Sequence, residues 1–426
     1  MRLDDFDYDL PEAAVAQRPA EPRDAARLLV DRRSRGVDHR RVADLPDLVR
    51  PGDVVVVNTT RVLPARLRLR KDTGGEVEVL LLERLPSGAW EALVRPGRRV
   101  RPGTVLQAGD DLAVHVDGPG PGEGTRLVEL LVGAGGGPGR LAADPAAGAA
   151  VGAGPAAGVD PAAAAAVGAG PAVAAVDLAA VAAEPAPGAA VGAGPAAGVD
   201  PGTAAGVDPA PAAVDPDAAE LAALDRHGAV PLPPYITAPL ADPDRYQTVF
   251  ADRPGSVAAP TAGLHLTPAV LDRCRAAGAR VEPVELMVGM GTFRPMSAPK
   301  VEDHHMHAER YRVPAATLDA CQAARAAGGR VVAVGTTTVR ALESAALSGE
   351  LAGRTELFIH RPWRWRAVDV LMTNFHLPRS SLLVLVDAFV GSRWRDLYAI
   401  ALAAGYRFLS FGDAMWVERD GGEASR

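Results

Sequence analysis

The chain has little cysteine and no long hydrophobic run, and both absences limit what it can be. Two cysteines, Cys274 and Cys321, occur among 426 residues, and both fall in helix-like patterns. The sequence therefore predicts neither a disulfide framework nor a cysteine metal site. No apolar run of about 18 residues occurs, so no membrane-spanning helix is expected. The acidic start, MRLDDFDYDLP, lacks the apolar segment of a signal peptide, and we expect a cytoplasmic protein.

An excess of positive charge is also missing, but the acidic surplus comes from one segment. The net charge of −7 gives no sign of a nucleic-acid binder. Residues 133–217, however, hold one basic residue, Arg140, and eight acidic residues: Asp144, Asp160, Asp177, Glu184, Asp200, Asp208, Asp215 and Asp217. Of the 45 basic and 52 acidic residues in the chain, 44 of each remain outside this segment. The rest of the protein is neutral overall and can carry basic patches.

Residues 133–219 form a low-complexity segment of Ala, Gly, Pro, Val and Asp. The string GAAVGAGPAAGVDP occurs at 148–161 and again at 188–201. A solenoid would need large apolar residues at fixed positions, and here almost all of them are valine. Frequent Gly and Pro oppose both helices and paired strands. We therefore expect a disordered insert that carries no chemistry.

The two sides of the insert show different secondary-structure patterns. Before it, the runs GDVVVVN, EVEVLLLERL, AWEALVR and RLVELLV are typical of strands separated by Gly and Pro, which predicts an antiparallel, barrel-like all-β domain. After it, strands alternate with helices, the first of which is capped by Thr267 and opened by Pro268. This alternation predicts an α/β domain with a largely buried sheet.

The expected domain organisation follows from these patterns. Residues 1–60 should form the N-terminal part of the α/β domain and 61–132 the barrel-like domain. The insert would cover 133–219, followed at 220–240 by the end of the β domain and a return linker. Residues 241–420 should form the remainder of the α/β domain, which would carry the catalytic residues.

Common catalytic signatures are missing from the sequence. There is no phosphate-binding P-loop, HExxH motif or nucleophile elbow, and VGMGTF has Arg294 where a dinucleotide fingerprint needs a third glycine. Unusual polar clusters remain in the C-terminal half. SVAAPTAGLHLTP places His265 just before a helix, and TNFHLPRSS places Asn374, His376 and Arg379 at a strand end. Ligands usually bind at such strand ends in open α/β sheets, although a lone histidine there is as often structural.

A third cluster, VGTTTVRALES, runs from a strand directly into a helix. Its hydroxyls and N–H groups can hold an anionic or polar ligand group, or they can simply cap a structural helix. Arg340 and Glu343 are one helical turn apart, so their side chains could form an ion pair.

The stretch VEDHHMHAER is richest in histidine, and three interpretations compete for it: a metal site, an acid–base site and a solvated loop. On a strand, His305, His307 and Glu309 would share one face and His304 the other. Three convergent metal ligands would then require Glu309. The residues alone leave these three interpretations open.

Motifs outside the insert resemble those of one enzyme family along nearly the whole chain. They include FDYDLPEAAVAQRPAEPRDAARLLV, VVVNTTRVLPARL, GGEVEVLLLE, VPLPPYI, RYQTVFADRPGSVAAPTAGLHLTP, GMGTFRP, DHHMHAE, VVAVGTTTVRALES, LMTNFHLPRSSLLVLVDAF and YRFLSFGDAM. In this order they closely resemble the S-adenosylmethionine:tRNA ribosyltransferase-isomerase family of queuosine biosynthesis.

The resemblance implies a reaction. The ribosyl group of S-adenosylmethionine would be transferred and isomerised onto 7-aminomethyl-7-deazaguanine at the tRNA wobble position, giving epoxyqueuosine and releasing adenine and methionine. S-adenosylmethionine would be a co-substrate, with no metal and no other cofactor. An α/β domain with a β-barrel domain is implied as well, and the enzyme is expected to be a monomer that does not bind membranes.

The resemblance also implies site residues. The reaction removes a proton from C5′ and assists the departure of adenine, steps suited to groups that titrate near neutrality. The candidate catalytic residues are His307, Glu309, His265, His376 and Glu343. Compared with the family pattern, VEDHHMHAER is expected to hold no metal, and His307 with Glu309 is the preferred acid–base pair. The candidate substrate-binding residues are Thr261, Gly263, Thr336, Thr337, Arg340, Asn374, Arg61 and Arg66.

Binding of tRNA needs phosphate contacts. Three segments offer them, namely RLRLRK at 66–71, RPGRRVR at 95–101 and HRPWRWR at 360–366, whose tryptophans could stack on unpaired bases. Each could equally be a solvated face. HRPWRWR also departs from the family pattern, which has a Pro-Gly turn followed by an aromatic residue. This departure keeps open the alternative of a paralogue that uses S-adenosylmethionine with another acceptor. The retained polar clusters speak against the other alternative, a non-catalytic tRNA-binding protein.

Overall fold

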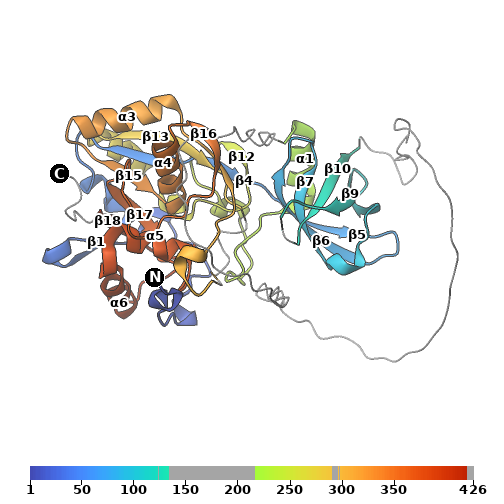
Figure 1. Cartoon of the computed structure of the whole chain (residues 1–426), viewed down its shortest axis with the longest axis horizontal. Helices are drawn as coiled ribbons and strands as arrows, with labels where there is room; N and C mark the ends of the chain where they lie inside the picture. The colour runs from blue at the N-terminus through green and yellow to red at the C-terminus, as the bar shows by residue number, and fades with distance from the viewer. Residues whose placement is uncertain (123, 134–215, 290–295, 297, 420–426) are drawn as a thin grey trace, which may run out of the picture. The chain divides into compact units, whose positions relative to one another are not determined.

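The structure is a computed structural model that describes residues 1–122, 124–133, 216–289, 296 and 298–419. These residues form an α/β part and a β-barrel part, and each is described separately (Figure 1). Almost all of the expected insert at 133–219, and most of the GMGTFRP motif, lie outside the described residues. No helix among the described residues is long and apolar enough to cross a membrane.

The α/β part is built on one nine-stranded sheet. Its order is β16 (Ala352–Thr355), β14 (Glu309–Arg312), β13 (Arg280–Leu286), β3 (Val54–Asn58), β15 (Val331–Val334), β17 (Val370–Asn374), β18 (Ala414–Glu418), β1 (Arg27–Asp31) and β2 (Val37–Arg41). Strands β13, β3, β15 and β17 run parallel to one another, whereas β18 is antiparallel to β17. The carboxyl ends of β3, β15 and β17 therefore lie at the same edge of the sheet, where ligands bind in folds of this kind.

Helices cover both faces of this sheet because its central strands are apolar on both sides. Val54 and Val56 of β3 belong to one hydrophobic core, whereas Val55 and Val57 belong to the other. The first core also contains side chains of α3 (Ala315–Ala326), α4 (Thr336–Ser348), α5 (Ser381–Val390) and α6 (Trp394–Ala403). The second contains side chains of α2 (Pro268–Ala276) and the 3-10 helix η5 (Val42–Asp47). The continuous valine run is thus a strand buried on both faces.

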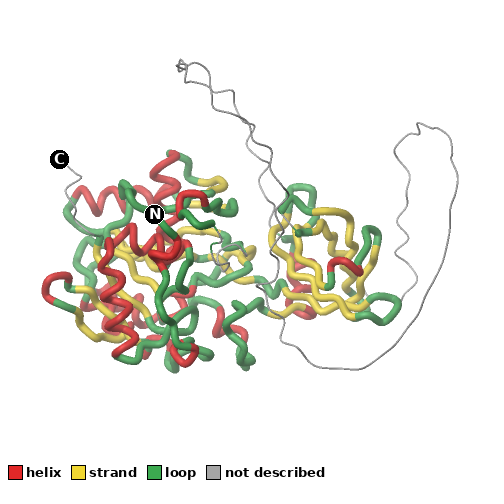
Figure 2. The backbone as a smooth tube through the Cα atoms, turned by 60° about the horizontal axis from the view of Figure 1, so that its bottom comes forward, coloured by secondary structure: helices red, strands yellow, loops and turns green. Residues whose placement is uncertain are grey.

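The second part is a closed antiparallel barrel, seen in Figure 2 as a ring of strands. Its strand order is β5 (Arg66–Arg70), β6 (Glu76–Arg84), β7 (Trp90–Arg95), β10 (Arg126–Val132), β9 (Leu112–Pro119) and β8 (Thr104–Ala108). Pairing of β8 with β5 closes the ring. Alternate residues such as Leu67 and Leu69 fill its interior. The predicted combination of an α/β domain and a barrel-like β domain is confirmed.

Several elements were not expected from the sequence. Strands β8 and β9 complete the barrel, and β11 (Gly228–Ala229) pairs with its strand β5. The helix α1 (Ala218–His227) is capped by Asp217, whose side chain accepts a hydrogen bond from the Glu220 N–H at 2.8 Å. Ala223 and Leu224 of α1 join the barrel core. Strands β4 (Thr60–Val62) and β12 (Arg253–Ser256) form a separate parallel pair.

Candidate active site

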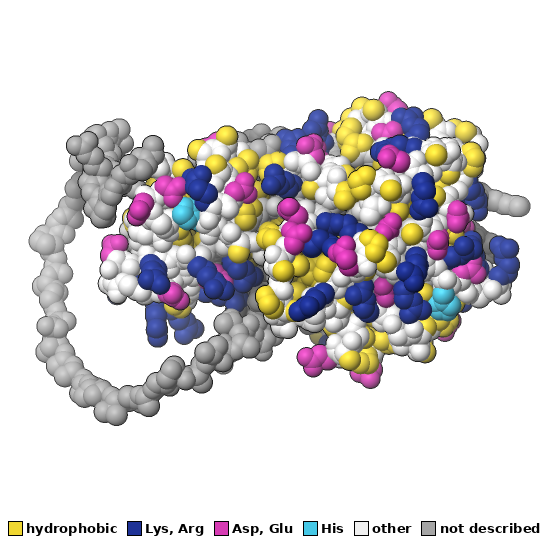
Figure 3. All heavy atoms as spheres, turned by 180° about the vertical axis from the view of Figure 1, so that it is seen from behind, with side chains coloured by type: hydrophobic (Ala, Val, Ile, Leu, Met, Phe, Trp, Pro, Cys, Tyr) yellow, Lys and Arg dark blue, Asp and Glu magenta, His cyan; other side chains and the backbone are white. Residues whose placement is uncertain are grey.

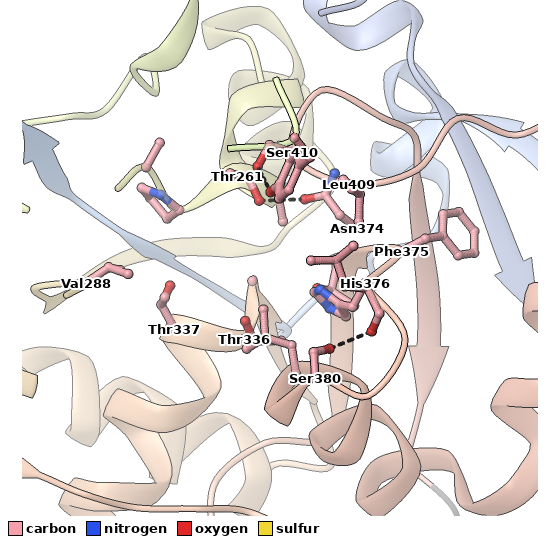
Figure 4. Close-up of a pocket in the computed structure, with 18 residues that line it drawn as sticks. Thr261, Val288, Thr336, Thr337, Asn374, Phe375, His376, Ser380, Leu409 and Ser410 are labelled. Carbon is pink, nitrogen blue, oxygen red and sulfur yellow. Dashed lines mark hydrogen bonds between the residues drawn. The ribbon is translucent and has the colours of Figure 1, made fainter. Parts of the chain in front are cut away.

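A pocket opens at the carboxyl ends of β15 and β17, the sheet edge that the topology favours for ligands (Figure 4). It has about 720 Å³ of space not filled by protein atoms, including its opening to solvent. The lining residues come from segments far apart in the sequence: Tyr235, Ala259–Ala262, Val288, Gly335–Thr337, Thr373–Leu377, Ser380, Leu382, Leu409 and Ser410. Four of the predicted substrate-binding residues are among them: Thr261, Thr336, Thr337 and Asn374.

One wall of the pocket is the N-terminus of α4. Gly335 caps this helix with φ 91°, a left-handed value that favours glycine, and thereby turns the chain from β15 into α4. The first N–H groups of a helix lack acceptors within it. Thr337 Oγ1 accepts a hydrogen bond from Asn58 Nδ2 at 3.2 Å, whereas none of the described residues hydrogen-bonds Thr336 Oγ1. This wall therefore offers hydrogen-bond donors and the positive end of a helix dipole to a ligand.

A second helix begins at the same pocket. Ser380 caps α5, where its Oγ accepts a hydrogen bond from the Leu383 N–H at 3.3 Å and donates one to the Leu377 carbonyl at 2.7 Å. Figure 4 shows Ser380, His376 and Thr336 facing the same space. The site thus lies between the positive ends of two helices, which favours an anionic group in the ligand.

Asn374 and Thr261 form the opposite wall. Thr261 Oγ1 donates a hydrogen bond to Asn374 Oδ1 at 3.0 Å (Figure 4). Asn374 Nδ2 lies 3.0 Å from His265 Nε2 and donates to the Asp413 carbonyl at 3.3 Å. His265 does not line the pocket but stands behind Asn374, and it is 4% exposed. Burial, with smaller contributions from Arg407 and Arg23, lowers the pKa of His265 to about 4, so its ring is neutral at neutral pH.

His376 is the one predicted catalytic residue that lines the pocket. Its Nε2 hydrogen-bonds with Thr373 Oγ1 at 3.0 Å, and its backbone N–H donates to the Tyr398 hydroxyl at 3.0 Å. Its carbonyl accepts a hydrogen bond from the Tyr8 hydroxyl. Burial lowers the pKa of His376 to about 3, so the ring faces the ligand as a neutral imidazole.

The pocket also contains residues that sequence reasoning missed. Leu409 has φ 69°, in the left-handed region where a bulky side chain is strained, and such residues gather at functional sites. The Tyr235 hydroxyl hydrogen-bonds Ser410 Oγ at 2.7 Å, and burial raises the pKa of Tyr235 to about 12. Tyr235 and Ser410 both lie in motifs shared with the family, VPLPPYI and YRFLSFGDAM. That shared pattern was the one signal that could have identified them.

The predicted acid–base pair of His307 and Glu309 is not formed. His307 is exposed, and none of the described residues hydrogen-bonds it. Glu309 is 4% exposed and forms an ion pair with Arg340, which is equally buried. Its other oxygen accepts the Gly289 N–H at 3.2 Å. The burial pattern separates the two residues because β14 starts at Glu309 and turns that side chain toward α4.

Arg340, predicted to bind substrate, instead lies among buried partners. Besides Glu309, its guanidinium donates to the Leu357 carbonyl at 3.1 Å and to the Thr355 carbonyl at 3.5 Å. It lines no part of the pocket and does not pair with Glu343. The expected pairing of Arg340 with Glu343 is wrong because Glu309 supplies a buried partner from β14.

Glu343 is fully buried in an array of N–H donors. It accepts hydrogen bonds from the Trp363 indole at 3.2 Å and from the backbone N–H groups of Ala367 at 2.9 Å and Val368 at 3.1 Å. The Arg366 N–H lies 3.1 Å from the same carboxylate. Glu343 therefore anchors the loop at 363–368 and does not face the pocket.

The HRPWRWR segment is packed against the α/β part. Arg361 forms an ion pair with Asp387 at 2.6 Å, and the Trp365 indole donates to the Ala388 carbonyl at 3.2 Å. Both tryptophans pack against the first hydrophobic core. Both tryptophans are half-buried, whereas Arg364 is exposed, and stacking of Trp363 and Trp365 on bases stays a prediction.

Three remaining predicted binding residues also lie outside the pocket lining. Gly263 is buried beside it, where a Cβ would approach Phe250 to 2.8 Å, so packing requires the glycine. Arg61 is exposed on β4. Arg66 lies on barrel strand β5 and pairs with Glu78 at 3.3 Å.

The histidine cluster forms no metal-binding group with other described residues. Among these, the His, Cys, Asp and Glu side chains close enough to share an ion are His115, Asp117 and Glu129 of the barrel, with ligand atoms within 4.8 Å of one another. His304 instead packs edge-on against Phe358, with 5.2 Å between ring centroids.

The basic segments of the barrel present arginines to solvent. Arg68, Arg98, Arg99 and Arg101 are exposed, and none of them forms an ion pair with a described residue. Arg70 pairs with Glu76 at 3.5 Å, and the Lys71 ammonium donates to the Arg99 carbonyl, so the two barrel segments adjoin. In the face drawn in Figure 3, Lys and Arg side chains are interleaved with Asp and Glu. The exposed Arg68, Arg98, Arg99 and Arg101 are together called the basic surface of the barrel.

Comparisons with known proteins agree along the described chain. The model of the queuosine biosynthesis protein family matches residues 3–137 and 210–417. A relative in Moorella thermoacetica, named S-adenosylmethionine:tRNA ribosyltransferase-isomerase, is 41% identical over 425 residues, covering 98% of this chain and all of that protein. A relative of the same name in Rubrobacter xylanophilus is 43% identical, with 97% of each chain covered. The crystal structure of an S-adenosylmethionine tRNA ribosyltransferase from Thermotoga maritima matches with a TM-score of 0.45 and 30% identity over 97% of this chain and 99% of that one.

Proposed function

Because the chain belongs to the S-adenosylmethionine:tRNA ribosyltransferase-isomerase family of queuosine biosynthesis, we propose that it performs this reaction. It transfers the ribosyl group of S-adenosylmethionine to 7-aminomethyl-7-deazaguanine at the wobble position of tRNA and isomerises it. The product is epoxyqueuosine, and adenine and methionine are released. S-adenosylmethionine is a co-substrate, and no metal or further cofactor takes part.

The pocket at the carboxyl ends of β15 and β17 is the main support for this function. S-adenosylmethionine has a carboxylate at one end and hydrogen-bond donors on its nucleoside. The pocket has a matching pair of walls: the N-termini of α4 and α5 on one side, and the oxygen atoms of Asn374 and Thr261 on the other. The carboxylate binds at the N–H groups and hydroxyls of Thr336 and Thr337, where the helix dipole stabilises negative charge.

His376 is the proton acceptor in this proposal. Of the five predicted catalytic residues, it is the one in the pocket wall. Burial lowers its pKa to about 3, so the neutral ring is a weak base, and the proposal depends on its position and on the acidity that the sulfonium gives the C5′ proton. Glu309 and Glu343 act in the architecture instead, because both carboxylates are buried in contacts away from the pocket. His307, on the surface, has no part in proton transfer.

Binding of the tRNA uses the basic surface of the barrel. Arg68, Arg98, Arg99 and Arg101 are exposed and carry no competing carboxylate partner among the described residues, so they are available to phosphates. The enzyme acts as a monomer in the cytoplasm, where tRNA is modified.

The test is to incubate the protein with S-adenosylmethionine and tRNA that carries the aminomethyl deazaguanine. Nucleoside mass spectrometry should detect epoxyqueuosine, and chromatography should detect adenine and methionine in equal amounts. Unmodified tRNA, with guanine at the wobble position, is the matched control and should give no product. Adenine release with a small-molecule amine but not with tRNA would instead identify an enzyme with another acceptor. Binding of tRNA without release of adenine would identify a non-catalytic protein.

A further inference from the structure

The hydrogen bonds around Asn374 fix which way its carboxamide faces. The Asp413 backbone carbonyl can only accept a hydrogen bond, so the Asn374 atom 3.3 Å from it must be the amide nitrogen. The other terminal atom, Oδ1, then accepts from the Thr261 hydroxyl at 3.0 Å. The orientation of the carboxamide is thus set relative to a backbone carbonyl, which has no alternative protonation or rotamer.

His265 completes the arrangement from behind. Its Nε2 lies 3.0 Å from the same Asn374 nitrogen, so Nε2 must be the acceptor and the ring must carry its proton on Nδ1. Asn374 is 2% exposed and His265 is 4% exposed, so water is largely excluded from this contact. Both amide hydrogens of Asn374 are then used inside the protein, one by His265 and one by Asp413.

The result is a pocket wall that can only accept hydrogen bonds. Asn374 Oδ1 has a second lone pair, and the Thr261 oxygen, having donated its hydrogen, has lone pairs as well. None of the described residues donates to these remaining positions, and both residues line the pocket. Without His265, only the longer hydrogen bond to the Asp413 carbonyl, at 3.3 Å, would oppose rotation of the carboxamide, which would present an N–H group to the ligand instead.

We propose that His265 is a positioning residue that holds the Asn374 carbonyl toward the ligand and so selects a nucleoside group that donates hydrogen bonds. With the proposed function as its premise, that group is the adenine amino group or a ribose hydroxyl of S-adenosylmethionine. His265 touches no ligand and moves no proton. Its burial and low pKa keep Nε2 unprotonated, as the arrangement requires.

Two replacements separate the positioning role from bulk packing. His265→Gln keeps an acceptor close to the position of Nε2, whereas His265→Phe keeps the ring but removes the acceptor. Calorimetry with S-adenosylhomocysteine should give a Kd for the Gln variant within about threefold of wild type and for the Phe variant about tenfold weaker, the effect of one buried hydrogen bond. The KM for tRNA should be unchanged in both. Equal loss in both variants, or wild-type affinity of the Phe variant, would overturn the proposal.

Three ligand analogues identify the donor. S-inosylhomocysteine replaces the adenine amino group by a carbonyl, and 2′-deoxy- and 3′-deoxy-S-adenosylhomocysteine each lack one ribose hydroxyl. For the analogue that lacks the recognised donor, His265→Phe should weaken binding less than it does for the parent ligand, because the contact is already lost. The same tenfold effect on all four ligands would contradict donor recognition.

One measurement does not depend on how well a variant folds. Nitrogen-15 NMR of the wild-type protein should show His265 Nε2 unprotonated and Nδ1 protonated at neutral pH, and a proton on Nε2 would refute the arrangement. Because these experiments use binding of the nucleoside alone, they remain interpretable if the wild-type protein proves unable to modify tRNA.

Discussion

The buried pair of Arg340 and Glu309 allows an architectural role to be distinguished from a catalytic one. Both side chains are 4% exposed. Glu309→Gln removes the negative charge but keeps a carbonyl oxygen that can still accept the Gly289 N–H, 3.2 Å away in the wild-type protein. The guanidinium would then remain buried with two backbone carbonyls, of Leu357 and Thr355, as its other acceptors.

The expected loss is large because a buried charge loses its partner. Breaking such a pair from one side costs about 3–5 kcal/mol. At roughly 2 °C per kcal/mol for a large domain, the melting temperature should fall by about 6–10 °C. The double variant Arg340→Met with Glu309→Leu replaces the pair by apolar side chains, and it should regain most of this stability. Asp272→Asn is the matched control, since its exposed pair with Arg275 at 2.7 Å should contribute at most about 1 kcal/mol.

Urea unfolding measures the free energy of unfolding of each variant, and adenine release measures its kcat. For Glu309→Gln, we expect kcat at a temperature well below the melting point to stay within about threefold of wild type, and for the double variant as well. A general acid or base would behave in the opposite way, with kcat reduced about 10²- to 10⁴-fold and stability unchanged. That second outcome would refute the assignment of Glu309 to the architecture.

Four further predictions concern other parts of the molecule. His376→Gln should lower kcat about 10²- to 10⁴-fold, with the Kd for S-adenosylmethionine changed by only a few fold, in single-turnover and calorimetric measurements; an unchanged kcat would exclude His376 as the proton acceptor. Above pH 6.5 the buried histidines should not affect the free energy of unfolding, and below it that free energy should fall as the pH drops toward 4, because the unfolded chain binds protons that the folded chain does not bind at His265 (pKa about 4) and His376 (pKa about 3). Each histidine should lower the free energy of unfolding by about 3–5 kcal/mol at most. Replacing His265 by Gln should reduce the slope of this free energy against pH, measured by urea titrations. Glu343→Ala leaves the N–H groups at 363–368 without their acceptor. Hydrogen exchange at the Ala367 and Val368 amides should therefore become faster, whereas the exchange rates of the β15 amides should change less. Replacing Arg98 and Arg99 together by Ala should weaken tRNA binding and reduce the salt slope by about 1–2, with the affinity for S-adenosylmethionine unchanged, and an unaltered slope would exclude this surface.

Much of the fold could be predicted from local sequence. The valine run of β3 and the alternation of β5 gave strands of the right kind, and Thr267 with Pro268 marked the start of α2 because a cap and a first-turn proline act locally. The closure of the barrel could not be predicted in the same way. It depends on the pairing of β8 with β5, two strands whose contact no local pattern encodes.

The site shows the same limit more clearly. Thr336, Asn374 and His376 were placed correctly near a strand end because parallel strands bring their carboxyl ends to one edge. Arg340 and Glu343 have the spacing of an ion pair on one helix, yet the Arg340 guanidinium pairs with Glu309 of β14 instead. The role of His265 was equally hidden, since its contact with Asn374 joins residues 109 positions apart.

Isotope transfer distinguishes ribosyl transfer to the tRNA from methyl transfer. S-adenosylmethionine labelled either in the ribose or in the methyl group is incubated with the protein and tRNA that carries the precursor, and the label in the tRNA is measured. If the ribosyl group is transferred, ribose label should enter the tRNA in an amount equal to the adenine released, and methyl label should not enter it. Methyl label in the tRNA, or adenine release without ribose label, would contradict ribosyl transfer.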